Sequence, residues 1–515
     1  MKAPDPAHEP GQETALRTQL ARGARWTLAA HGARQLLTLV FQIILARLLA
    51  PEDFGLLAMV VVFSGFASML VDLGFGPALV QAPAAGPRQA LSVWWITLLA
   101  GSVLAGLTFA AGPAVATFYG QPVLASVAAL LAMQIWLSAL AVVPTALLSR
   151  ELRLRALGMV DILAGLSGGL VAVALALGGH GALALASQLV AASAVTAVGV
   201  HLVARFRPRL CFDLAAVREL VGFSSHLVGY RVFEYWVRSA DKLLIGRFVG
   251  AAGLGLYSRA YSTMLIPVSQ VGDVAGRVMF PALCRLRSDA ARSRELYLRA
   301  LRGIALVSFP LMTTLFVLAD EFLVVVFGPP WAGATDVLRV LCAVGLMQSI
   351  GTTTGWIYRS QGRADWQFRF GIAAGTSALL AFAIGVNWGI LGVAVAYLVR
   401  NLALTWFNFA IPGRLIGLRY RHVVASVGGI LACALMAAGA LAVFDAALSA
   451  PEGGILAPEA GLGRLVAKLA FGGCAYLGLV AGFRLRALGE VMDLVTGAFG
   501  SPRGAPQDAV EALSR

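Results

Sequence analysis

The sequence has little charge. Asp, Glu, Lys and Arg make up only 13% of its 515 residues, where a typical soluble protein carries about a quarter, whereas 59% are hydrophobic. A folded chain of this size could not remove that much apolar surface from water. The composition therefore excludes a soluble enzyme and a disordered chain, and it predicts an all-α polytopic membrane protein.

Cysteines and catalytic motifs are also scarce. The five cysteines are scattered, without the spacing of a disulfide framework or a metal site. No Walker A sequence, HExxH motif or nucleophile elbow is present, and the first 25 residues lack the apolar core of a cleavable signal peptide. These absences argue against an enzyme, a built-in ATP motor and any cofactor.

The remaining charges are unbalanced, because 40 basic residues against 26 acidic ones leave a net charge of +14. The basic residues lie between apolar runs, so the expected partner is the surface of membrane lipids, and no nucleic acid is expected.

Long apolar runs dominate the chain. A hydrocarbon core about 30 Å thick needs roughly 20 helical residues per crossing. About 14 runs meet this requirement, and the seventh and eighth are the least hydrophobic. The predicted spans are 27–48, 54–76, 91–117, 123–147, 157–178, 182–204, 219–238, 256–280, 303–326, 335–357, 367–386, 389–411, 423–444 and 466–483.

The basic loops predict the orientation. Arginines gather in alternate loops, such as 149–155, 205–209, 285–302 and 414–421, whereas most intervening loops are neutral or acidic. Because cytoplasmic loops carry the excess of Lys and Arg, both termini are expected in the cytoplasm. The expected location is the bacterial cytoplasmic (inner) membrane.

An internal repeat divides the spans. Residues 43–57 (IILARLLAPEDFGLL) match 243–257 (LLIGRFVGAAGLGLY) at an offset of 200, which aligns Arg47 with Arg247 and Gly55 with Gly255. Six crossings return the chain to the same side, so the two copies are parallel repeats around a central cavity.

The predicted organisation is a cytoplasmic N-terminal tail (1–25), a six-helix N-lobe (26–204), a cytoplasmic linker (205–218), a six-helix C-lobe (219–412), two further helices (413–486) and a disordered cytoplasmic tail (487–515).

Four predicted helices carry ionisable side chains in stripes. A charge at mid-bilayer costs about 2.5–3.5 kcal/mol on insertion scales, so such groups usually face water or a partner. Stripes on helices 1, 2, 7 and 8, which are equivalent pairs in the two repeats, can converge on one hydrophilic path for an anionic, sugar-bearing cargo. The candidate path residues are Arg34, Gln42, Asp72, Arg231, Glu234, Arg238, Asp241, Asp273 and Arg277.

A structural interpretation of the same residues stays open. The pairs Arg231–Glu234, Arg238–Asp241 and Asp273–Arg277 could be salt bridges that only hold helices together.

Other polar and aromatic residues are expected to have structural roles. Asp161 is expected to be a cap or loop partner, and Trp331 an interfacial anchor. Tyr235 and Trp236 could stack on a sugar ring or pack between helices. The acidic residues Asp320, Glu321 and Asp445 are expected to be solvated at the interface.

Several motifs resemble a known family. Residues 46–55 (ARLLAPEDFG), followed by 71–76 (VDLGFG), are similar to the polysaccharide transport family of oligosaccharide flippases, as are 241–248 (DKLLIGRF), 255–261 (GLYSRAY) and 280–283 (FPAL). These are Wzx-type exporters within the multidrug/oligosaccharidyl-lipid/polysaccharide (MOP) superfamily. The resemblance covers residues 16–420. The charged residues 226–238 depart from it, so their roles rest on this sequence alone.

The resemblance implies a V-shaped pair of six-helix lobes with alternating access. It implies a cargo of undecaprenyl-diphosphate-linked oligosaccharide, moved from the cytoplasmic to the periplasmic leaflet for exopolysaccharide, capsule or O-antigen assembly. Polysaccharide polymerase and export machinery are possible partners. Proton or sodium coupling is possible, with Glu234, Asp72 or Asp273 as titrating candidates.

The sequence leaves three other functions open. A cation-coupled multidrug exporter of the superfamily would favour an acidic, aromatic cavity, and a lipid II flippase would share a basic one. From a different class, a membrane glycan polymerase or ligase would need catalytic residues on a long external loop, which the sequence lacks.

Overall fold

The structure of the protein is a computed structural model that describes residues 32–72, 79, 86–209, 225–449, 461–483 and 489. The predicted N-terminal tail, the linker from residue 210 on and, apart from residue 489, the predicted C-terminal tail lie outside the described residues.

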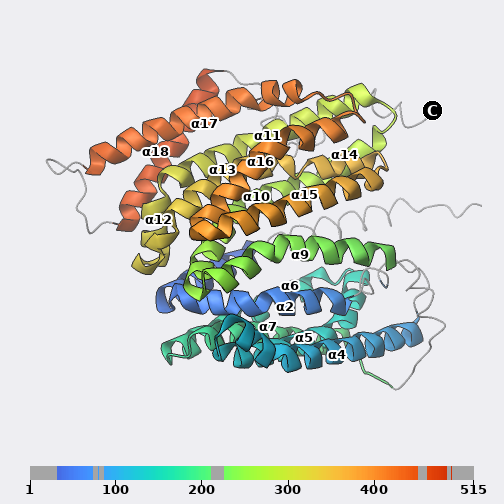
Figure 1. The fold of residues 1–515 in the computed structure, drawn as a ribbon. Coiled ribbons are helices and arrows are strands. Elements are labelled where there is room, and N and C mark those ends of the chain that lie inside the picture. The colour runs from blue at the N-terminus through green and yellow to red at the C-terminus, as the bar shows by residue number, and fades with distance from the viewer. Residues whose placement is uncertain are drawn as a thin grey trace, which may run out of the picture. The chain divides into compact units, whose positions relative to one another are not determined.

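Every regular element of the described chain is helical (Figure 1). A lipid bilayer offers no water to backbone N–H and C=O groups, and a helix satisfies them internally. Residues 32–48 form the first helix. The others are α2 (Pro51–Asp72), α4 (Pro87–Tyr119), α5 (Val123–Arg150), α6 (Leu154–Leu177), α7 (Ala182–Ala204), α9 (Ser225–Phe248), α10 (Ala251–Arg285), α11 (Ala290–Val317), α12 (Ala319–Phe327), η1 (Pro329–Ala334), α13 (Thr335–Gly351), α14 (Thr354–Ser360), α15 (Ala364–Gly385), η2 (Val386–Trp388), α16 (Gly389–Gly413), α17 (Tyr420–Ser449) and α18 (Gly461–Gly482).

The all-α polytopic prediction is confirmed, since each predicted span overlaps one of these helices. Ten stretches of the described chain are long and apolar enough to cross a membrane. The charged helices α9 and α10 are not among them. Two predicted spans are wrong in one respect, because each falls on two helices: 303–326 covers the end of α11 at Val317 and the short α12, and 335–357 covers α13, which ends at Gly351, and the start of α14.

Packing divides the chain into two compact units, Met1–Ser258 and Arg259–Arg515. In the first unit α5 packs against α2, α4 and α7, while α9 packs against α2. The predicted lobe boundaries, 26–204 and 219–412, stay a prediction.

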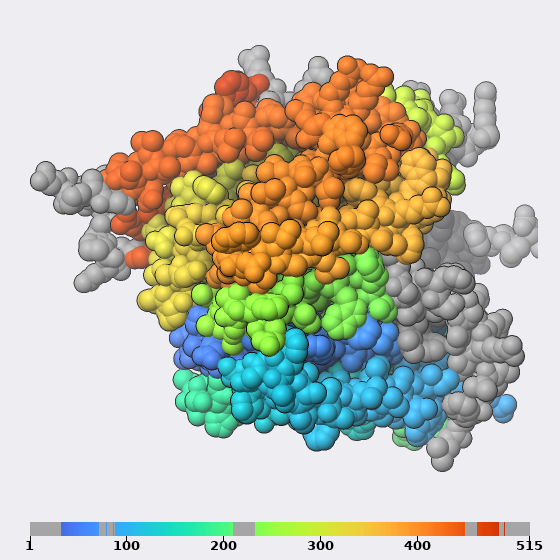
Figure 2. Space-filling model, viewed as in Figure 1, coloured from blue at the N-terminus to red at the C-terminus, as the bar shows by residue number. Residues whose placement is uncertain are grey.

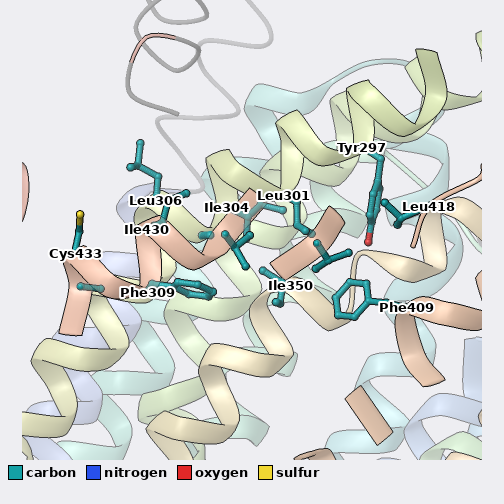
Figure 3. Packing of buried hydrophobic residues seen from close by; sticks show 14 of the residues in the cluster. Tyr297, Leu301, Ile304, Leu306, Phe309, Ile350, Phe409, Leu418, Ile430 and Cys433 are labelled. Carbon is teal, nitrogen blue, oxygen red and sulfur yellow. The ribbon is translucent and has the colours of Figure 1, made fainter. Parts of the chain in front are cut away.

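The second unit is built around α11, which packs against α13 and α17. Its apolar core gathers side chains from several helices, as Figure 3 shows. Tyr297 in this core is fully buried and shares a hydrogen bond of 2.7 Å with Thr353. Asp289 caps the start of α11, because its side chain accepts the backbone N–H of Arg292 at 3.0 Å.

The two copies of the repeated segment contact each other through their equivalent glycines. A Cβ on Gly55 would overlap the backbone carbonyl oxygen of Ala251, and a Cβ on Gly255 would overlap that of Pro51. Since 51 and 55 become 251 and 255 at the offset of 200, the contact is reciprocal, like that of a symmetric dimer. Glycine at both positions lets the two backbones approach closely.

Within the second unit, buried charge joins the two C-terminal helices to each other and to α12. Lys468 on α18, only 2% exposed, contacts Glu321 on α12 and Asp445 on α17. Arg464 lies 4.0 Å from the same glutamate. The prediction that Glu321 and Asp445 are simply solvated is therefore wrong, because their carboxylates neutralise a lysine that would otherwise be buried alone.

We expect Gly55→Ala to lower the free energy of unfolding by about 1–3 kcal/mol, because the new methyl group has no room. Gly106→Ala is the matched control on α4 of the same unit, since nothing lies within 4 Å of a Cβ there. Thermal unfolding of the purified protein, followed by tryptophan fluorescence, measures both. Equal midpoints for the two variants would contradict the close contact.

We expect Lys468→Met to destabilise the protein by roughly 3–5 kcal/mol, because two carboxylates lose their buried partner. Arg339→Gln is the control, since it removes an exposed ion pair with Asp336, worth about 0–1 kcal/mol. The triple variant that adds Glu321→Gln and Asp445→Asn should recover part of the loss in thermal unfolding. No recovery would show that packing, not charge, sets the effect.

Candidate functional site

Helix α9 carries an exposed ion pair in the middle of its length. Arg238 Nη1 lies 3.8 Å from Glu234 Oε1, one turn away, and the arginine side chain is 68% exposed. Arg238 is thirteen residues from the start and ten from the end of α9, or about 20 and 15 Å along the helix. An exposed charge in a membrane span faces water or a polar partner, because hydrocarbon cannot solvate it.

Asp241 lies one turn further along α9 but is 3% exposed. Tyr257 Oη on α10 donates to its carboxylate at 3.1 Å, and the backbone N–H of Lys242 donates at 2.7 Å. The suggested Arg238–Asp241 salt bridge is therefore wrong, since the arginine pairs with Glu234 instead. Asp241 is held in a helix–helix contact and not on the exposed stripe.

The first helix places Arg34 against α6. Arg34 Nη1 donates to Asp161 Oδ2 at 3.2 Å, which joins helices 127 residues apart in sequence. Gln42, two turns along the same helix, is half-buried. Asp161 is thus the ionic partner of a candidate path residue, and the expectation of a cap or loop partner is wrong.

Helix α10 exposes Asp273 and Arg277, one turn apart. Neither takes part in an ion pair within 4.0 Å in the described structure, so the suggested Asp273–Arg277 salt bridge is absent there. The side chains of Asp72 and Arg231 lie outside the described residues. The convergence of the four stripes on one cavity stays a prediction.

The aromatic residues on α9 pack between helices. Tyr235 Oη donates to the backbone carbonyl of Val62 on α2 at 2.8 Å, and the Trp236 ring lies 5.3 Å from that of Phe66. Trp331, predicted as an interfacial anchor, is fully buried, with the guanidinium carbon of Arg259 5.1 Å from its ring centroid. That assignment is wrong, because burial and the cation–π contact fix this ring inside the second unit.

A second polar feature, which the sequence analysis missed, is a cavity of about 210 Å³ between α13, α15 and α16. We call it the α16 cavity. Figure 2 shows α15 and α16, in orange, on the viewed surface of the second unit. Seven polar residues line it: Gln348, Thr352, Tyr397, Arg400, Asn401, Thr405 and Asn408.

Hydrogen bonds hold this lining in place. Gln348 donates to Tyr397 Oη at 2.6 Å, and Asn401 donates to the backbone carbonyl of Tyr397 at 2.8 Å. Asn408 donates to the carbonyl of Gly351 at 3.2 Å. The sequence feature that could have predicted this cavity is a polar stripe on one face of an apolar helix, formed by Tyr397, Asn401, Thr405 and Asn408. These amides and hydroxyls are neutral, so no pair of opposite charges marks them in the sequence.

Within the residues described, no three His, Cys, Asp or Glu side chains lie close enough together to hold a metal ion.

The profile of one protein family, described as polysaccharide biosynthesis protein, matches residues 44–336, which is more than half of the chain. The chain belongs to this family. The match includes α9, α10 and the Gly55–Gly255 contact, so the polar stripes and the repeat contact lie in the part that carries the family pattern. The resemblance to oligosaccharide flippases is confirmed.

Named relatives share most of their length with this family member. The lipopolysaccharide biosynthesis protein WzxC of Escherichia coli (strain K12) is 27% identical over 80% of this chain and 85% of its own. The succinoglycan biosynthesis transport protein ExoT of Rhizobium meliloti (strain 1021) is 26% identical over 76% of this chain and 79% of its own.

A solved structure shares the fold. The lipid II flippase MurJ, in an inward closed conformation, superposes with a TM-score of 0.69 over 89% of this chain and 98% of its own. Their sequences are 12% identical, so the likeness is one of fold.

Proposed function

We propose that this protein is a flippase. It moves an undecaprenyl-diphosphate-linked oligosaccharide repeat unit from the cytoplasmic to the periplasmic leaflet, for exopolysaccharide, capsule or O-antigen assembly. The observation that carries the proposal is the exposed Arg238–Glu234 pair halfway along α9, in a chain of the polysaccharide biosynthesis family. Relatives named for lipopolysaccharide biosynthesis and succinoglycan transport support it.

The physics of the cargo requires such a surface. A sugar headgroup and a diphosphate cannot enter hydrocarbon without losing their hydration, whereas the lipid tail is already soluble there. A polar surface inside the membrane shields the headgroup while the tail stays in the bilayer. Arginine suits the diphosphate because its planar guanidinium binds two oxygens at once. By alternating access, this surface is presented first to one side of the membrane and then to the other. No chemical bond changes.

The cellular setting is part of the same proposal. The protein lies in the inner membrane with both termini in the cytoplasm, because the arginine-rich loops alternate with neutral or acidic ones. Polysaccharide polymerase and export machinery take up the flipped repeat unit on the periplasmic side.

A proton or sodium gradient drives the cycle in this proposal. The sequence suggested Glu234, Asp72 or Asp273 as titrating groups, and the packing adds Asp241. This carboxylate is buried on a polar helix with a tyrosine hydroxyl and a backbone N–H as donors. A carboxylate in such surroundings binds a proton or gives it up as its surroundings change.

Reconstituted vesicles test the function. The cargo is the lipid-linked oligosaccharide extracted from cells that lack the protein, in which it should accumulate. We expect Arg238→Glu to lower flipping at least tenfold, because two glutamates then repel each other and the cargo's diphosphate. Arg292→Glu is the control, since Arg292 is equally exposed and paired with Asp289 but lies at a helix end; it should stay within twofold. Normal flipping by the Arg238 variant would count strongly against this surface.

The same vesicles test the cargo specificity and the energy coupling. Lipid II in place of the extracted cargo should not be flipped at a comparable rate. An imposed proton or sodium gradient should speed flipping by the wild type, and Asp241→Asn should abolish that response if Asp241 is the coupling group. Transport that ignores both gradients would remove the coupling proposal and leave the flippase proposal intact.

Cysteine labelling tests the orientation. In a variant without native cysteines, a cysteine at Glu151, between α5 and α6, should react with an impermeant maleimide only after the cytoplasmic side is opened. A cysteine at Gly179, between α6 and α7, should react in intact spheroplasts. Both positions are exposed. The reverse pattern would overturn the orientation.

A further inference from the structure

Arg400 is a cation deep inside a membrane-spanning helix. It lies eleven residues after Gly389 and thirteen before Gly413, or about 17 and 20 Å from the two ends of α16. That places it near the middle of a hydrocarbon core about 30 Å thick. An arginine at this depth is costly, so it is expected to face a partner or a polar cavity.

The partners of Arg400 are neutral. Its guanidinium donates to Ser377 Oγ at 3.2 Å, to Asn401 Oδ1 at 3.4 Å and to the backbone carbonyl of Ala374. No carboxylate of the described chain lies within 4.0 Å of it. These contacts use three of its five N–H donors and leave its positive charge without an opposite charge.

The α16 cavity offers hydroxyl and amide groups beside this charge. Gln348, Asn401 and Asn408 present amides, and Thr352 and Tyr397 present hydroxyls. Such groups both donate and accept, so they suit a ligand rich in hydroxyls. At about 210 Å³ the cavity lies below the roughly 300–1,000 Å³ of pockets for drug-sized ligands, which suits one sugar or phosphate group better than a whole repeat unit.

We infer that the α16 cavity binds an oxyanion, a carboxylate or a phosphate, that is attached to a sugar. Arg400 supplies the two remaining guanidinium N–H donors to the anion, while the amides and hydroxyls contact the sugar. This inference rests on the proposed function and deepens it, because it assigns to the second unit a binding site for one charged group of the cargo. The oxyanion is either the diphosphate of the lipid carrier or the carboxylate of an acidic sugar.

Protection of a cysteine tests the inference. Thr352→Cys places a thiol at the exposed edge of the α16 cavity, in full-length protein whose Cys211, Cys284 and Cys474 are serine. The probes are inorganic pyrophosphate, glucuronic acid and the neutral sugar glucose. We expect at least one of the two acids to slow maleimide labelling about tenfold, and glucose to change it less than twofold. Protection by pyrophosphate alone points to the carrier's diphosphate, and protection by glucuronic acid alone to an acidic sugar.

Three variants separate charge from structure. Arg400→Gln should abolish the protection, because the site loses its cation. Ser377→Ala removes one of the two hydrogen bonds from Arg400 to α15 but keeps that charge, and Arg414→Gln removes an exposed arginine at the end of the same helix. Both should keep the protection. Should Arg400→Gln fail to fold, Arg400→Lys keeps the charge without the guanidinium geometry, and weaker protection is expected.

Several outcomes would overturn the inference. These are equal protection by glucose and the acids, equal protection of the wild type and Arg400→Gln, or no protection by either acid. The vesicle assay keeps this result apart from the proposed function. If the wild type flips its cargo but neither acid protects the cysteine, only the binding site in the α16 cavity is contradicted. If the wild type does not flip its cargo, the flippase proposal is contradicted, whatever the labelling shows.

Discussion

The inability of hydrocarbon to solvate polar groups governs this protein. It makes helix the regular structure of the described chain, because only a helix satisfies its own backbone N–H and C=O groups along a crossing. It also makes every ionised side chain in a span a cost that some contact or some water must offset. The charges are few, so the environment of each one is informative.

The structure sorts these charges into three kinds. Some hold helices together, as Lys468 does between Glu321 and Asp445, and as Arg34 does with Asp161. Others lie exposed along α9 and α10. Arg400 forms a third kind, with neutral partners and a polar cavity beside it.

Part of the candidate site follows from residue order and could be predicted, whereas the rest depends on how the helices pack. The 200-residue offset, the spans and the stripe on α9 are properties of residue order, and the helical period alone places Glu234 and Arg238 on one face. Which carboxylate an arginine meets depends on how helices pack. Arg238 has two acidic neighbours at helical spacing, Glu234 and Asp241. It forms its ion pair with Glu234, whereas Asp241 accepts a hydrogen bond from Tyr257 on the next helix. Glu321 and Lys468 lie 147 residues apart in the sequence, so no local sequence pattern predicts their ion pair.

The sequence by itself determined that the chain is a polytopic helical membrane protein, where most of its helices lie, and which family it resembles. Apolar run length, helical period and local motifs carry that information without any knowledge of contacts. Only the tertiary structure decided which charges are neutralised, that Gly55 and Gly255 let two backbones meet, and that the amides of α13 and α16 enclose a cavity with Arg400. These features join residues that are distant in the chain, and packing alone brings them within the few ångströms over which hydrogen bonds and ion pairs act.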